Sequence, residues 1–319
     1  MKTNDKLDSF INGILKENPW TNVYGVARSV LALGTLLTLF FNDAGILFRP
    51  IAGVEDCPSC KGMAVYSIFC LFDNLEIARW VCVGILTLVM SGFMPRFTAI
   101  LHVWVTFSFM ATAPLVDGGD QITIVLSCLL LPICLTDNRK WHWQAREFIS
   151  QNWFDDMKIF IARTTLFMIR VQMAFVYFEA CIGKFKVAEW ANGTAIYYWF
   201  SNPTFGLSPE VFEFLTPIFS NSIAILLITW SVLLIEGLLF LGITMNKKYW
   251  HYLLVIGISF HAMIIVVHGL PTFFMAMSSG LILFLRPFDE PFKLPQFVNM
   301  FNSTFLLKSH KQLIVNKTA

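Results

Sequence analysis

The chain has 319 residues, of which 56% are hydrophobic and 14% are charged, and its mean hydropathy is +0.64. This composition excludes a water-soluble globular protein and predicts an all-α helical bundle that crosses a lipid bilayer several times. The net charge of +2 is small, and the positive residues follow the pattern of membrane topology. We therefore expect no nucleic-acid partner.

Apolar runs of about 20 residues predict about eight transmembrane helices. The polar segment before the first run has no cleavable signal, so the first helix is expected to double as the targeting signal. No repeat or linker divides the chain, and we expect a single membrane domain at about 18–287 within residues 1–319, with short tails. The expected helices are 24–41, 75–94, 97–116, 121–136, 159–183, 222–244, 249–268 and 272–285.

Lysine and arginine are distributed unequally among the connections. Most of them lie in the two tails and in the second, fourth and sixth loops, whereas the alternate loops hold only Arg49, Lys61, Lys184 and Lys186. Because cytoplasmic loops collect positive charge, both termini are predicted to be cytoplasmic. The outer segments are then 42–74, 117–120, 184–221 and 269–271.

The first outer loop contains Cys57-Pro58-Ser59-Cys60, with Cys70 ten residues further on. Two thiols at this spacing form a structural disulfide, form a redox-active pair, or stay reduced. We expect a Cys57–Cys60 disulfide, with redox activity as the alternative. No second pair and no histidine lie nearby, so we expect no metal site.

Three further features have mainly structural interpretations. Arg28 lies in the cytoplasmic third of the first helix, where its side chain can snorkel to the surface. His102 is expected to be a hydrogen-bonded spacer in the third helix. The polar, tryptophan-containing segment 137–158 predicts an amphipathic helix at the cytoplasmic interface.

A polar stripe follows the fifth span toward its outer end. Arg163, Arg170 and Tyr177 lie seven residues apart on one face, and Gln172 and Glu179 lie on a neighbouring face. Charges inside a membrane rarely persist unless they pair or act, so the stripe indicates either a working site or ion pairs that fix helix packing. The later spans add Glu236, His261 and His268, and we expect these groups to line one cavity with the stripe.

The stripe ends in an outer segment that is rich in charged and aromatic residues. We predict that Lys184, Lys186, Glu179, Glu236 and His261 are catalytic, and that Trp190, Tyr197, Tyr198, Arg170 and His268 bind substrate. The alternatives are that the lysines snorkel to the headgroups and that the aromatic residues form an interfacial belt. A short outer helix is expected at 210–217.

Several motifs carry a family resemblance that covers 18–287. Tyr177-Phe178, Gly183-Lys184, Trp190 and Tyr197-Tyr198, followed by Phe260-His261, resemble the horizontally transferred transmembrane (HTTM) domain related to vitamin K-dependent gamma-carboxylase. Within that superfamily the chain resembles the bacterial SdpB family. The stretches that carry this resemblance are NPWTNVYGVARSVLALGTLLTLF, PRFTAILH, DGGDQITIVLS and EWANGTAIYYWFSNPTFGL.

The resemblance implies a multipass plasma-membrane protein that acts with an SdpA-like partner to convert a secreted toxin precursor into an active antimicrobial peptide. In the carboxylase a lysine of this region is the base that deprotonates a quinol, and its counterpart here is Lys184 or Lys186. A quinone cofactor is thereby implied. The Asn-Asn-His element of the carboxylase is not evident in this chain.

These observations leave four functions in competition. The leading hypothesis is a maturation factor, either an enzyme or an enzyme subunit. The others are an export channel for the peptide, a toxin-binding immunity protein, and a quinol-dependent carboxylase-like enzyme. HExxH and GxSxG motifs are absent from the sequence, which favours presentation of the precursor over its cleavage by a known protease mechanism.

Overall fold

A computed structural model describes residues 17–51, 57–144, 148 and 150–293. The described residues form helices and loops, with one isolated β-bridge between Phe93 and Trp141. The helices are α2 (Asn22–Phe41), α3 (Ala44–Leu47), η1 (Gly62–Tyr66), α4 (Ile68–Leu71), α5 (Leu75–Ser91), α6 (Pro95–Thr112), α7 (Gly118–Thr136), α8 (Trp153–Phe185), α9 (Ala188–Ala191), α10 (Ala195–Phe200), α11 (Pro209–Phe219), α12 (Ser222–Leu241), α13 (Lys247–His268) and α14 (Pro271–Leu285).

The expected helices are all present, close to their predicted bounds. Among the described residues, α2, α7, α8, α12 and α13 are long and apolar enough to cross a membrane, while α14 is a shorter apolar helix of 15 residues. The predicted helical class and helix positions are therefore confirmed, and the structure supports five crossings by length and composition. The short helix expected at 210–217 is also present, as α11.

Local sequence signals explain where several of these helices begin. Side chains that accept hydrogen bonds from first-turn amides satisfy N–H groups that have no partner within the helix. Asn74, Asn152 and Asn221 cap α5, α8 and α12 in this way, and Asp117 forms a reciprocal capping box with Asp120 on α7. Proline at the first helical position begins α6, α11 and α14.

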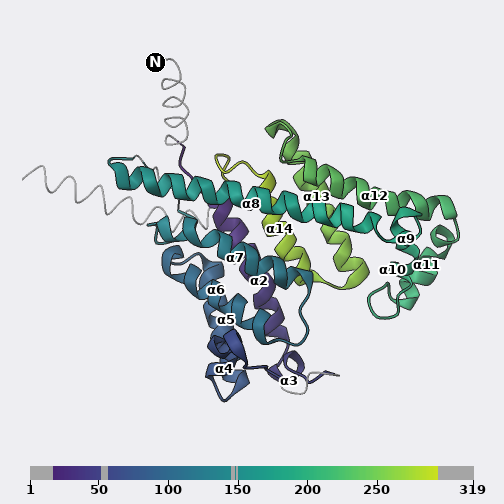
Figure 1. Cartoon of the computed structure of the whole chain (residues 1–319), viewed down its shortest axis with the longest axis horizontal. Coiled ribbons are helices and arrows are strands. Elements are labelled where there is room, and N and C mark those ends of the chain that lie inside the picture. The colour runs from purple at the N-terminus through teal and green to yellow at the C-terminus, as the bar shows by residue number, and fades with distance from the viewer. Residues whose placement is uncertain (1–16, 52–56, 145–147, 149, 294–319) are drawn as a thin grey trace, which may run out of the picture.

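Helix α2 lies at the centre of the fold and packs against α14, α5 and α7 (Figure 1). Its first half, up to Leu31, belongs to a core shared with α7, α8 and α14, and its second half, from Ala32, packs with α5 and α6. The Ser279 hydroxyl of α14 donates a 2.8 Å hydrogen bond to the Ala27 carbonyl of α2. Close contact between backbones is typical of helices that associate inside a membrane.

Helix α8 connects this core to the other side of the molecule. Its 33 residues give a length of about 50 Å, which exceeds the roughly 30 Å hydrocarbon core of a bilayer. Helix α12 packs on α8, and α9, α10 and α11 gather at one end of α12, away from α5 and α6 (Figure 1). These short helices share a separate small core around Trp190, Ile196 and Phe219. We call the unit formed by α9, α10 and α11 the cap.

The predicted helix at 137–158 is wrong for residues 137–144, whereas residues 153–158 are helical as the start of α8. Residues 137–144 form a folded loop, and helix α8 begins only at Trp153. The loop docks on the α5–α6 turn: the Met94 amide donates to the Lys140 carbonyl at 2.7 Å, and the His142 amide donates to the Gly92 carbonyl at 3.0 Å. Asp137, Arg139 and His142 are buried in these tertiary contacts, whereas Asn138 and Lys140 are exposed.

Candidate functional site

Two charged side chains from the predicted set meet between α8 and α12. Lys184 Nζ donates to both carboxylate oxygens of Glu236, at 2.6 and 2.9 Å. The Glu236 side chain is 7% exposed and the Lys184 side chain is 25% exposed. Because each charge neutralises the other, the pair avoids most of the cost of placing an isolated ion among apolar helices.

A second polar pair lies beside the first. The Tyr177 hydroxyl and His261 Nε2 are 2.9 Å apart, and both side chains are buried. The negative charge of Glu236 acts on Tyr177, and the positive charge of Lys184 acts on His261. We call Tyr177, Lys184, Glu236 and His261 the Lys184 site.

The helices explain why these four side chains come together. Tyr177 and Lys184 lie seven residues apart on α8 and so share a helical face. Glu236 faces them from α12 and His261 from α13. The Nδ1 atom of His261 has no hydrogen-bond partner among the described residues. The site thus consists of two pairs, a lysine with a carboxylate and a phenol with an imidazole, and groups of these four kinds can exchange protons with a bound substrate.

The cap forms a wall of the Lys184 site. The Lys184 ammonium lies 5.4 Å from the ring centre of Trp190, which is buried at 8% exposure. Trp190 therefore positions the lysine and presents little surface to a substrate. The turn that follows needs glycine, because Gly193 has φ +76° and a β-carbon there would lie 2.2 Å from Leu226.

Other predicted site residues lie outside this cluster. Lys186 and Glu179 are exposed, and Arg170 precedes Lys184 by fourteen residues on α8, about 21 Å along the axis. Tyr197 and Tyr198 are 41% and 58% exposed on the cap. His268, at the end of α13, bonds the Phe205 carbonyl through Nδ1 and contacts the rings of Trp199 and Phe200.

The cysteine pairing differs from the prediction. The disulfide joins Cys60 to Cys70, with an S–S distance of 2.06 Å, and Cys57 is not part of it. The prediction of a Cys57–Cys60 disulfide is therefore wrong. No group of three or more potential ligands among the described His, Cys, Asp and Glu residues could hold a metal ion.

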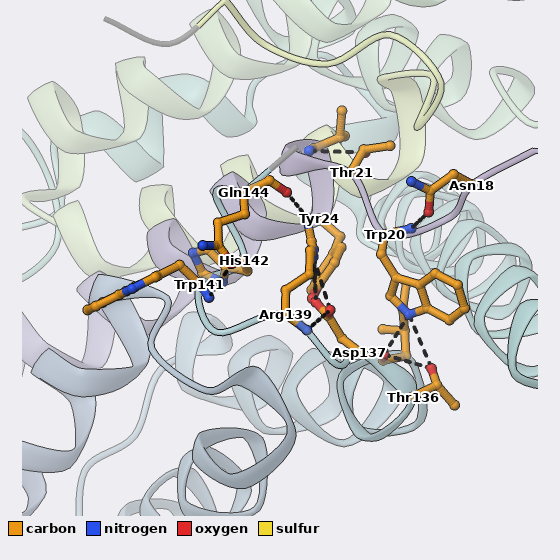
Figure 2. Close-up of polar contacts among 12 residues, drawn as sticks. Asn18, Trp20, Thr21, Tyr24, Thr136, Asp137, Arg139, Trp141, His142 and Gln144 are labelled. Atoms are coloured by element: carbon orange, nitrogen blue, oxygen red, sulfur yellow. Dashed lines mark hydrogen bonds and ion pairs between the residues drawn. The ribbon is translucent and has the colours of Figure 1, made fainter. Parts of the chain in front are cut away.

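Sequence reasoning missed a second buried cluster, at the start of α2 (Figure 2). Arg139 Nη2 donates to Asp137 Oδ2 at 2.8 Å, Arg139 Nε contacts both oxygens of the same carboxylate, and Tyr24 donates its hydroxyl proton to that carboxylate as well. Arg139 Nη1 also donates to the Gln144 carbonyl at 2.8 Å. We call Tyr24, Asp137 and Arg139 the clamp, because they join α2 to the end of α7 and the following loop.

His142 and Arg28 lie beside the clamp and are completely buried. The Ser29 hydroxyl donates to the Met90 carbonyl at 2.6 Å, so its oxygen is left to accept from His142 Nε2 at 3.1 Å. Burial lowers the pKa of His142 well below its ordinary value, and the positive charges of Arg28 and Arg139 lower it further. His142 is therefore a neutral imidazole at physiological pH.

Arg28 does not snorkel as predicted. Its Nη2 donates to Thr98 Oγ1 at 2.8 Å, while its Nε and Nη1 atoms have no hydrogen-bond partner in the described part of the chain. His102, predicted to be a hydrogen-bonded spacer, is buried with no partner for Nε2 among those residues. The sequence signals for this cluster were Gly92 and the polar residues directly after α7. Gly92 has φ +81°, and a β-carbon there would lie 2.3 Å from the His142 ring.

In the part of the chain that the structure describes, the fold and the Lys184 site define a helical protein with five candidate membrane spans and an ion pair between two of them. The chain is 39% identical over 279 residues to the uncharacterized protein YitO of Bacillus subtilis (strain 168), covering 86% of this chain and 88% of the relative. It is 36% identical over 294 residues to the sporulation-delaying protein SdpB of the same strain, covering 91% and 88%. The chain therefore belongs to the SdpB family. No family model and no solved structure matches it.

Proposed function

We propose that this protein is the membrane component that matures an exported sporulation-delaying-type peptide toxin, together with an SdpA-like partner. The similarity to sporulation-delaying protein SdpB over most of both chains supports a role in the sporulation-delaying system. The peptide precursor is the substrate, and the Lys184 site is where the processing chemistry occurs or is supported.

The observation that carries this proposal is the Lys184–Glu236 pair beside Tyr177 and His261. Placing two charges among apolar helices is costly, and a well-packed apolar pair often stabilises a fold equally well or better. The presence of two neighbouring pairs of proton-exchanging groups among these helices is therefore better explained by chemistry than by packing. Lys184 can act as a base after passing its proton to Glu236, or as a cation that stabilises a developing oxyanion.

The proposed topology places this chemistry at the outer membrane interface of the plasma membrane, with eight crossings and both termini cytoplasmic. This topology puts the start of α2 and the segment after α14 on the same, cytoplasmic side of the membrane. Contacts support this placement, because Asn22 at the start of α2 exchanges two 2.8 Å hydrogen bonds with Phe292, after α14. The clamp joins the end of α7 to the start of α2, so the end of α7 lies on this side as well. Lys184 lies at the end of α8, next to the cap, whose exposed Tyr197 and Tyr198 are suited to gripping a peptide.

A quinol-dependent, carboxylase-like reaction is the second candidate. The observation that favours it is the placement of the two lysines: Lys184 is paired and partly buried, whereas Lys186 is exposed. Lys184 is thus the better counterpart of the superfamily base. Carboxylation would add mass to the peptide without cutting it, so the mass of the secreted product separates the two candidates.

The test is mass spectrometry of peptides secreted by a toxin-producing strain that carries Lys184→Ala or Glu236→Gln. We expect each variant to release unprocessed precursor, while Lys186→Ala, the matched control, releases mature peptide. Immunoblots of the membrane fraction verify that each variant is present. Mature peptide from both site variants at the wild-type level would contradict the proposal.

Deletion of the protein separates the other hypotheses. Precursor outside the cell supports maturation, whereas precursor trapped inside identifies an export channel. Normal mature toxin that kills the producing strain identifies an immunity protein.

A further inference from the structure

A pocket beside the middle of α8, on the N-terminal side of the Lys184 site, contains three arginines. It has a volume of about 140 Å³ and lies between α2, α8 and the end of α14. A single water needs only about 10–15 Å³ by the same measure, so the pocket holds a group of several heavy atoms. Arg163 and Arg170 enter it from α8, and Arg286 enters it from the end of α14.

Two of the arginines already have acidic neighbours at the rim. Arg163 pairs with Glu17, whose side chain is 45% exposed. Arg286 donates two hydrogen bonds to the Glu290 carbonyl, at 2.9 and 3.0 Å, and lies 4.0 Å from the Glu290 carboxylate, which is 62% exposed. Ion pairs with such exposed carboxylates are weak, so an anion whose oxygens contact several of the guanidinium groups at once can displace them.

Arg170 differs from the other two arginines. Its guanidinium stacks 4.1 Å from the ring centre of Trp250, and it has no ion pair or hydrogen bond among the described residues. The acidic residue near it, Asp289, is paired at the surface with Lys247. Arg170 lies seven residues, or about 10 Å, further along α8 than Arg163. A half-buried cation that faces two other cations is stabilised by an anion between them.

We propose that this pocket binds a phosphate group, and specifically the headgroup of an anionic phospholipid. Guanidinium groups match phosphate oxygens with paired hydrogen bonds, and three of them supply enough charge to bind a phosphodiester. A soluble phosphate shares this chemistry, but the remaining walls favour a lipid.

Those walls are apolar and reach the outer surface of the bundle. Leu166, Leu283 and Phe288 line the pocket, and Phe167, which also lines it, is 57% exposed. Phe288 stacks 4.4 Å from the Arg163 guanidinium, and the hydrogen bonds between Asn22 and Phe292 hold this segment across the start of α2. Acyl chains can therefore lie along Phe167 while the headgroup enters among the arginines. Basic pockets between helices at a membrane surface are typical sites for anionic lipids.

The experiment measures lipids retained by the full-length protein in detergent micelles that contain equal amounts of phosphatidylglycerol and phosphatidylcholine. Native mass spectrometry counts the bound lipids on the wild type, Arg170→Gln, Arg163→Gln and Arg96→Gln. Arg96 is the matched control, because it belongs to the same end of the bundle and bonds the Leu135 carbonyl outside the pocket. A parallel titration with inorganic phosphate, read by thermal shift, tests the soluble source.

We expect the wild type and Arg96→Gln to retain at least tenfold more phosphatidylglycerol than phosphatidylcholine, and each pocket variant to lose most of this preference. If Arg170→Gln does not fold, Arg170→Lys, which keeps the charge, and Arg163→Gln decide the question: the first keeps part of the preference and the second loses it. Saturable binding of one inorganic phosphate without lipid preference would assign the anion site to a soluble phosphate. Equal retention of both lipids with no phosphate binding, or an equal loss in Arg96→Gln, would overturn the proposal.

Discussion

Lys184 on α8 holds both carboxylate oxygens of Glu236 on α12, at 2.6 and 2.9 Å, where two candidate membrane spans meet. The lysine reaches the boundary of the bundle, since its side chain is 25% exposed, while the glutamate is buried at 7%. Loss of one partner therefore leaves a charge in a poorly hydrated place, and loss of both leaves a neutral contact.

The first prediction separates the structural contribution of this pair from its chemistry. Lys184→Met or Glu236→Leu alone should lower the free energy of unfolding by about 2–3 kcal/mol, somewhat less than for a fully buried pair because Lys184 is partly hydrated. The double variant should recover most of this loss, because no unpaired charge remains. Thermal unfolding in detergent micelles measures the cycle, and additive losses in the double variant would contradict the coupling.

The second prediction concerns the clamp. Asp137→Ala should destabilise the fold by about 3–5 kcal/mol, because it leaves the buried Arg139 guanidinium without its counter-charge. Tyr24→Phe removes one hydroxyl and should cost about 1–2 kcal/mol. Melting temperatures in detergent test this order. Equal losses in the two variants would mean that Arg139 finds another anion.

The third prediction is a pH dependence of stability that comes from His142. Its pKa is depressed in the folded state, so below about pH 6.5 the unfolded chain binds a proton that the folded chain does not. The free energy of unfolding should then fall by about 1.4 kcal/mol per pH unit as the pH drops from 6.5 to 5. The contribution of His142 is thus complete above pH 6.5 and is lost on acidification.

The variant His142→Gln tests this assignment. It should be less stable at neutral pH, because it leaves the position beside Gly92 and Ser29, but its stability should fall less steeply between pH 6.5 and 5. Thermal unfolding at several pH values gives both slopes. Identical slopes for the variant and the wild type would assign the pH dependence to other groups.

The fourth prediction follows from the Cys60–Cys70 bond. The disulfide closes a loop between two cysteines that are ten residues apart in the sequence. It should contribute about 2–3 kcal/mol to the free energy of unfolding. Cys60→Ser and Cys70→Ser should therefore lower the melting temperature equally, and Cys57→Ser should not change it. Peptide mapping without reductant identifies the pairing directly, and a linked peptide that joins residues 57 and 60 would refute it.

Much of the architecture could be predicted from apolar runs and from capping residues, since both are local signals. The sequence also indicated that intramembrane charges would pair or act, because an isolated charge among apolar helices is costly, but residue spacing alone did not show that Lys184 pairs with Glu236. The exposed positions of Lys186 and Glu179 could not be predicted, because charge and sequence distance do not tell which side of a helix faces its neighbours.

The clamp escaped prediction for a physical reason. A polar segment with tryptophans has the same composition whether it lies on a membrane surface or folds into a pocket, and only the partners decide between the two. The Asp137 carboxylate finds Arg139 and Tyr24, and the His142 ring fits against Gly92. The cysteine pairing escaped for a related reason: three cysteines in one loop allow three single bonds, and the fold of the loop selects one.

The most direct test of the account uses the double variant Lys184→Met/Glu236→Leu, which is expected to fold. Mass spectrometry of the peptides secreted by a toxin-producing strain with this variant should find exported precursor and no mature peptide, while Lys186→Ala releases mature peptide as the wild type does. Mature peptide at the wild-type level from the folded double variant would contradict the central claim, because the Lys184 site would then only hold α8 and α12 together.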